Sequence, residues 1–248
     1  DRPTSPMTRL AGADDDGATD GDGGALTILG GRDDVGGGTW LATNEAGVVA
    51  GLTNRPLPDG PDTAKRSRGE LPLLLARYSS AAAAVDAFGS TIDPADYNPS
   101  WLLVGDRDAV FFVDVTGTER VTVEQRPPGV EVLENRTLHE PSPKVDRVRR
   151  LLDPFLGCPP DVLLPRLQIL LADHERPPGE PPREASNPRL AAAVRAICVH
   201  ADEDDYGTRS SAVITVGDAA APPTMRWTDE APCRDRWCTS DDLWSRTP

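Results

Sequence analysis

Polar side chains with binding or catalytic potential follow two short apolar runs of this 248-residue sequence. The run at residues 48–52 leads through Thr53 into Asn54 and Arg55, and a second run at 130–133 leads into Asn135. Amide and guanidinium groups donate hydrogen bonds, and binding groups gather at strand ends and in the loops beside them. These positions are therefore candidates for a site, and the alternative is that each only closes a turn.

A glycine-rich bend precedes the first of these runs. Residues 30–38 include Gly30, Gly31, Gly36, Gly37 and Gly38. Glycine adopts backbone conformations that other residues resist, and it lets a ligand or another strand come close. The bend is expected to feed two short strands, either as the wall of a site or as a plain hairpin.

Several familiar chemistries are not indicated by any motif. The sequence contains no P-loop, no Gly-x-Gly-x-x-Gly after a strand, no Gly-x-Ser-x-Gly and no His-Glu-x-x-His. His139, His174 and His200 are far apart in the sequence, so a histidine-based triad is not predicted.

The cysteines and the acidic runs do not predict a metal site. Cys233 and Cys238 could form a local disulfide or half of a metal site, but no second pair has zinc-like spacing. Cys198 lies in an apolar run and is expected to be a small buried residue. The acidic run at 202–205 is expected to be a solvated loop. We therefore expect no metal and no cofactor.

Composition excludes some classes of partner. The net charge of −14 disfavours binding to a nucleic-acid backbone. No run of about 18 apolar residues is present, so no membrane span is expected. With 25 prolines and 22 glycines, the sequence predicts many loops around one modest core. A cytoplasmic protein is expected.

Periodicity predicts strands and helices in separate groups, which favours layers over a βαβ repeat. Strands are expected at 25–29, 39–43, 48–53, 101–104, 110–115, 120–125, 130–133, 212–216 and 224–228. Helices are expected at 71–78, 81–88, 142–158, 161–172 and 189–196.

Blocks of residues in register resemble one known family. They are Asp1–Thr4, Leu29–Asp33, Gly37–Leu41, Leu52–Arg55, Ser67–Glu70, Pro143–Val145 and Tyr206–Ser210. The sequence resembles the NRDE proteins, also called the transport and Golgi organisation protein 2 family, from residue 1 to about 216.

The resemblance implies an α+β fold: a four-layer αββα sandwich of the N-terminal-nucleophile (Ntn) hydrolase type. We expect a single domain over residues 1–248, with an irregular start at 1–24, a proline-rich loop at 176–188 and a tail at 229–248. Related Ntn amidases cleave linear C–N amide bonds with an N-terminal cysteine whose own amino group acts as the base.

The resemblance also implies roles for individual residues. Asn54 and Asn135 would be oxyanion-hole donors, and Arg209 would orient the site electrostatically. The substrate-binding residues would be Gly38, Thr39, Trp40 and Arg55. The alternatives are that both asparagines close turns and that Arg209 pairs with the acidic run before it.

One part of the family pattern is absent from this sequence. The family begins with Met-Cys-Thr and a strand ending in Asn-Arg-Asp-Glu, whereas this sequence begins at Asp1. The first strand is therefore expected to be missing, with a gap beside residues 38–43 that Asn54 faces. Without the nucleophile, we expect a protein of the amide-hydrolase type that is inactive as given. The alternative is a non-catalytic binding protein for a hydrophobic ligand such as haem or an acyl lipid.

Overall fold

The computed structural model describes residues 4–11, 26–57, 60–116, 119–179, 188–218, 221–239 and 243–244. They fall into two compact units. The sheet unit comprises Arg2–Pro128, Val216–Thr224 and Ser240–Pro248, and the helical unit comprises Gly129–Thr215 and Met225–Thr239. A single domain over residues 1–248 stays a prediction. The predicted loop at 176–188 and the tail at 229–248 lie partly outside the described residues.

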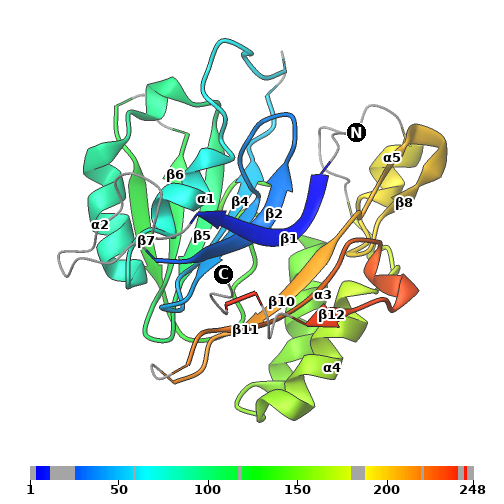
Figure 1. The fold of residues 1–248 in the computed structure, drawn as a ribbon. Helices are drawn as coiled ribbons and strands as arrows, with labels where there is room; N and C mark the ends of the chain where they lie inside the picture. The colour runs from blue at the N-terminus through cyan, green and yellow to red at the C-terminus, as the bar shows by residue number, and fades with distance from the viewer. Residues whose placement is uncertain are drawn as a thin grey trace. The chain divides into compact units, whose positions relative to one another are not determined.

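The sheet unit is built on a seven-stranded sheet whose described strands follow one another in sequence order (Figure 1). Every neighbouring pair is antiparallel. The short connections at residues 45–48 and 106–109 explain two of these pairs, because a tight turn can join only antiparallel neighbours. Residues 55–99 form a much longer connection between the fourth and fifth strands. The strands are β1 (Thr4–Ala11), β2 (Ile28–Asp33), β3 (Leu41–Asn44), β4 (Val49–Asn54), β5 (Ser100–Gly105), β6 (Val110–Val115) and β7 (Thr122–Arg126).

The N-terminal end of the sheet corrects two expectations. β3 is hydrogen-bonded to β2 on one side and to β4 on the other, so the expected gap beside residues 38–43 is wrong. The expected irregular start is wrong for residues 4–11, which form the edge strand β1. Pro6 obscured this strand in the sequence, but proline is tolerated at a sheet edge, and the register shifts between Ser5 and Thr8.

Two helices, α1 (Glu70–Leu75) and α2 (Ala81–Thr91), cover one face of this sheet (Figure 1). Ser80 starts α2 by accepting a hydrogen bond from the Ala83 N–H at 3.2 Å. A short 3₁₀ helix, η1 (Pro94–Asp96), leads into β5. The buried side chains between helices and sheet form the main core, and each large one contributes about 1.5–3 kcal/mol. They include Leu71, Leu75, Phe88, Leu102 and Val113.

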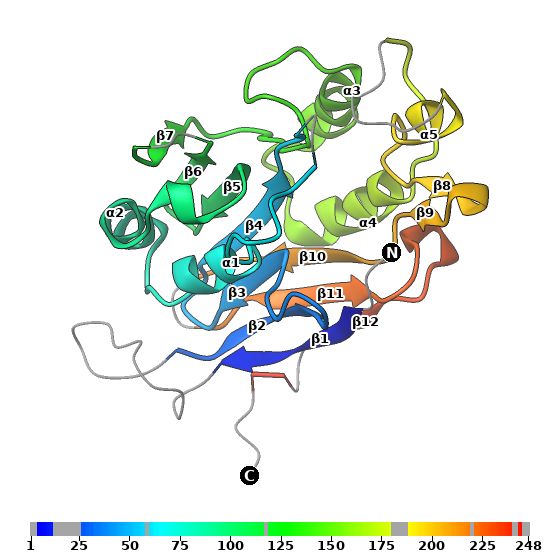
Figure 2. The same cartoon turned by 90° about the horizontal axis from the view of Figure 1, so that it is seen from above.

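The helical unit combines short helices with two small sheets (Figure 2). Ser142 caps its first helix by accepting from the Val145 N–H, and Pro143 occupies the first turn. The helix α4 contacts the strand β10. The helices are α3 (Pro143–Leu152), α4 (Pro160–Leu171), α5 (Pro188–Ala193) and the 3₁₀ helices η2 (Asp153–Phe155), η3 (Asp202–Asp204) and η4 (Pro232–Arg234). The strands are β8 (His200–Ala201), β9 (Tyr206–Gly207), β10 (Ser211–Thr215), β11 (Thr224–Thr228) and β12 (Cys238–Thr239).

The mixed α+β class with antiparallel sheets is confirmed. The strand expected at residues 130–133 is wrong, because that segment has no strand geometry. An alternating run becomes a stable strand only when it can pair with neighbours.

Candidate functional site

A polar pocket lies in the sheet unit, where the glycine-rich bend after β2 meets the segment before α1. It has a volume of about 280 Å³, and we call it the loop pocket. Pockets for small ligands typically start at about 300 Å³, and this one lies just below that size. It is lined by Asp33, Val35, Gly36, Thr39, Trp40, Pro61, Asp62, Thr63, Lys65, Arg66, Ser67, Arg68, Gly69 and Asn98.

The glycine-rich bend is held in shape by Asp33. The Asp33 side chain is buried, and its Oδ1 accepts hydrogen bonds from the N–H groups of Val35 at 2.9 Å and Gly36 at 2.8 Å. Gly37 has φ +74°, a conformation that favours glycine. The bend is thus a fixed wall of the pocket.

The second wall approaches the first through two glycines. The Thr39 N–H donates to the Gly69 carbonyl at 2.9 Å. A Cβ atom on Gly38 would lie only 2.3 Å from the Gly69 carbonyl carbon, so a larger residue would separate the loops. Gly38 and Gly69 therefore hold the two walls together.

Three basic side chains line the loop pocket against two acidic ones, Asp33 and Asp62. Lys65 Nζ donates to the Tyr97 carbonyl at 3.1 Å, and Arg68 donates to the Pro99 carbonyl at 3.4 Å. Arg66 is already committed to Glu70, with hydrogen bonds of 2.9 and 2.8 Å.

Two buried residues, Asn98 and Tyr97, contact the segment that carries these cations. Asn98 is buried and is bonded twice to the Asp62 backbone, accepting from its N–H at 2.9 Å and donating to its carbonyl at 2.8 Å. The ring of Tyr97 is also buried, and the guanidinium of Arg66 lies 5.2 Å from its centroid. Burial, followed by the nearby charge of Glu70, raises the pKa of Tyr97 to about 12.

Two apolar side chains also line the loop pocket. Trp40 is 41% exposed and Val35 is 65% exposed. Large exposed apolar groups beside polar ones are typical of binding sites, because the apolar part of a ligand can cover them.

The structure separates the predicted substrate-binding residues. Thr39 and Trp40 line the loop pocket, but the Thr39 hydroxyl is already engaged, donating to the Leu41 carbonyl at 2.8 Å. Gly38 acts in loop closure and does not line the pocket. Arg55 is exposed, and its backbone N–H donates to Pro99.

Asn54 lies at the end of β4, directly opposite Ser100 of β5. Strand alternation gives it the same sheet face as Leu52, which belongs to the core under α1 and α2. The Asn54 Oδ1 and Ser100 Oγ atoms are both buried and have no hydrogen-bond partner among the described residues. Two unpaired polar atoms on opposed residues leave hydrogen-bonding capacity at this strand end.

The other two predicted catalytic residues, Asn135 and Arg209, belong to the helical unit, and both are exposed. Their roles stay predictions. The neighbours of Asn135, Glu134 and Arg136, line a small cavity of about 20 Å³ with Lys144. Burial lowers the pKa of Lys144, and the charge of Glu134 opposes this shift.

Sequence reasoning did not single out the basic side chains of the loop pocket. Residues 57–63 read as a surface loop, and nothing local marked Lys65 or Asn98 as lining a pocket. The block Ser67–Glu70, which contributed to the family resemblance, could have indicated these side chains, but no binding role was assigned to it.

Fold and pocket together define an α+β protein with antiparallel sheets and a polar pocket. The family model described as "Transport and Golgi organisation 2" (TANGO2) matches residues 2–223. The chain therefore belongs to the TANGO2 family.

A solved structure similar to this chain is penicillin V acylase from Agrobacterium tumefaciens, at 12% identity and a TM-score of 0.38, covering 90% of this chain and 70% of that one. No curated protein matches. None of the helices in the described ranges has the length and apolar character needed to cross a membrane.

Proposed function

We propose that this TANGO2-family chain binds a small amide bearing a carboxylate, such as an N-acyl amino acid, in the loop pocket. The observation that carries the proposal is the charge of the lining. Three basic and two acidic side chains line the loop pocket, in a chain whose net charge is −14. Because Arg66 is paired with Glu70, the cation that favours an anionic ligand at this place is Lys65.

Lys65 is the best placed of the three cations to meet a carboxylate. Its ammonium group carries three donors, of which one goes to the Tyr97 carbonyl. Within the described part of the chain it forms no ion pair, whereas Arg66 is paired with Glu70. A charge-assisted hydrogen bond to a ligand carboxylate contributes about 1.5–3 kcal/mol.

The apolar lining gives the same ligand a second anchor. Trp40 and Val35 both line the pocket and are both exposed, so an acyl chain can cover them while the carboxylate meets Lys65. Covering apolar surface contributes about 25 cal/mol per Å². A ligand with an anionic end and an apolar end therefore suits this lining better than a purely polar one.

The family resemblance supports the amide in this proposal, together with a four-layer αββα fold of the Ntn type. The lining of the loop pocket gives no support for hydrolysis by this chain. The lining offers the hydroxyls of Thr39, Thr63 and Ser67 but no thiol, and the four cysteines belong to the helical unit. Binding is therefore the function that we assign to the loop pocket.

A second candidate function is non-catalytic binding of a hydrophobic ligand such as haem or an acyl lipid. The exposed indole of Trp40, at the lining of the pocket, favours it. Titration with haem, followed in the Soret band, tests it, and an unchanged spectrum at micromolar protein would exclude haem.

The proposal is tested by calorimetric titration with matched ligand pairs. Each pair consists of an N-acyl amino acid and its methyl ester, which keeps the amide and the acyl chain but removes the charge. We expect the acid to bind at least about tenfold more tightly, because a charge-assisted bond is lost in the ester. Equal affinities for acid and ester would contradict the proposal. Product analysis of the same mixtures should show no amide cleavage.

A further inference from the structure

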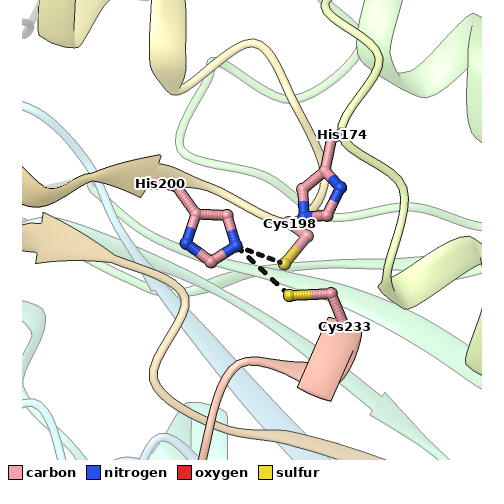
Figure 3. Close-up of side chains that lie close together, drawn as sticks. All are labelled: His174, Cys198, His200 and Cys233. Carbon is pink, nitrogen blue, oxygen red and sulfur yellow. Dashed lines mark hydrogen bonds between the residues drawn. The ribbon is translucent and has the colours of Figure 1, made fainter. Parts of the chain in front are cut away.

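Four metal-ligating side chains converge within the helical unit. They are His174, Cys198, His200 and Cys233, and one ligand atom from each lies within 4.8 Å of all the others. The Nε2 atom of His200 lies 3.5 Å from the Cys198 sulfur and 3.3 Å from the Cys233 sulfur (Figure 3). The rings of His174 and His200 are 5.0 Å apart and inclined by 51°.

The two separations between His200 and the cysteine sulfurs match the size of a tetrahedral zinc site. Zinc binds sulfur at about 2.3 Å and nitrogen at about 2.0–2.1 Å, so the donor atoms of one site lie about 3.3–3.8 Å apart. Both measured His–Cys distances fall in that range. Two cysteines with two histidines are also a donor set that zinc takes in structural sites.

The backbone that carries these ligands is fixed by hydrogen bonds. The Cys198 N–H donates to the carbonyl of Asp173, which joins the segments of Cys198 and His174 at 2.9 Å. His200 opens strand β8 and pairs with Gly207 of β9. Two segments of the chain therefore present three of the ligands from defined positions, as preorganised metal binding requires.

The third segment is the 3₁₀ helix η4, which carries Cys233. Glu230 accepts hydrogen bonds from Arg234 at 3.1 Å and from Arg236 at 2.9 Å, which holds the chain on both sides of this turn. Exposed ion pairs of this kind contribute little energy, but here they restrict the loop that presents the sulfur.

The site also has an entry route for an ion. Cys198 is fully buried, Cys233 is half-buried, and both histidines are exposed. A cavity of about 330 Å³ is lined by His174, Cys198 and His200. An ion can therefore reach the buried sulfur past the two imidazoles.

We propose that His174, Cys198, His200 and Cys233 bind one Zn²⁺ ion with a structural role in the helical unit. Binding converts both thiols to thiolates and releases their two protons to solvent, while the imidazoles bind as neutral ligands. Four protein ligands complete the tetrahedral shell, so no position is left for a substrate. The ion would join the segment after α4, strand β8 and η4.

The proposed site differs from the expectation from the sequence that no metal site is present. That expectation paired Cys233 with its neighbour Cys238, and it treated Cys198 and the histidines as unrelated. The structure groups Cys233 with Cys198 instead, and Cys238 is an exposed residue outside the cluster. The ligands are spread from residue 174 to residue 233, so no short motif connects them.

The test is metal binding by the full chain, purified under reducing conditions and stripped of metal. Titration with Zn²⁺ against a chromophoric chelator should give one ion per chain, and Co²⁺ should give the intense absorption of tetrahedral thiolate coordination. Cys233→Ser and His174→Gln should each weaken binding at least about 100-fold, because a direct ligand contributes at least as much as its supporting groups. Cys158→Ser and Cys238→Ser are matched controls and should bind like the unaltered chain.

Three results would overturn the proposal. One is equal Zn²⁺ affinity in Cys233→Ser and Cys238→Ser. Another is a Co²⁺ spectrum without thiolate bands. The third is a Cys198–Cys233 disulfide in a separate preparation purified without reductant, detected by mass spectrometry of unreduced peptides. Because Cys198 is buried, Cys198→Ser could fail to fold, and the half-buried Cys233 and exposed His174 keep the test independent of that outcome.

Discussion

At the scale of single residues, the loop pocket depends on two glycines that bring its walls together. Gly38 packs directly on the backbone of Gly69, while Gly37 beside it faces open space with φ +74°. The two neighbours thus need glycine for different reasons, one steric and one conformational.

Substitution of these glycines should separate the two reasons. Gly38→Ala should lower the free energy of unfolding by about 3 kcal/mol, because the new methyl group overlaps backbone atoms that cannot rotate away. Gly37→Ala should cost about 1–2 kcal/mol, the ordinary penalty of the left-handed conformation. Urea denaturation measures both. An equal cost at the two positions would contradict the close packing of Gly38 on Gly69.

Individual site residues were only partly accessible to sequence reasoning. The family resemblance assigned Trp40 and Thr39 to the site; both line the loop pocket, but Thr39 uses its hydroxyl within the bend. Lys65 was missed because its contact is with the Tyr97 carbonyl, more than thirty positions along the chain. A contact of that range depends on the path of the backbone, which local patterns do not encode.

At the scale of elements, the exposed face of α2 contains an interior glycine without a packing role. A Cβ atom on Gly89 would meet no atom within 4 Å. Gly89→Ala should therefore raise the free energy of unfolding by up to about 1 kcal/mol, the difference in helix propensity. Thermal unfolding measures the gain, and Ala83→Gly, on the exposed surface of the same helix, should have the opposite sign. A loss of stability in Gly89→Ala would show that the position is not open.

The link between η1 and β5 should make the sheet unit sensitive to alkali. Tyr97 follows η1, and its pKa is raised from 10.0 to about 12, chiefly by burial. Because the folded pKa lies above the unfolded one, this contribution to stability is complete below pH 10 and is lost as the pH rises to about 12. Between these values, the free energy of unfolding should fall more steeply in the unaltered chain than in Tyr97→Phe. Parallel curves would contradict the burial of an uncharged phenol.

Elements were predicted well where local signals agree. α2 and α3 have serine caps followed by helix formers or apolar residues at helical spacing, and both were found. Strand β1 was missed because Pro6 reads as a breaker, although it lies on an edge strand. The strand predicted at 130–133 fails for the opposite reason: its local alternation is suitable, but the fold supplies no partner. Strand pairing is a non-local property.

At the scale of the whole molecule, the family assignment and the two proposals rest on different parts of the chain. The family assignment rests on residues 2–223, which include most of both units. The binding proposal rests on the lining of one pocket in the sheet unit, and the zinc proposal rests on four ligands in the helical unit. Failure of one proposal would leave the other unchanged.

The most direct test of the binding proposal is the affinity of an N-acyl amino acid for two variants that each remove one positive charge from the sheet unit. Lys65→Gln alters the lining of the loop pocket, whereas the exposed Arg77→Gln does not. Calorimetry should show at least about a tenfold loss of affinity for Lys65→Gln, equivalent to one charge-assisted hydrogen bond, and no change for Arg77→Gln. Equal affinities in the two variants would contradict the loop pocket as the binding site.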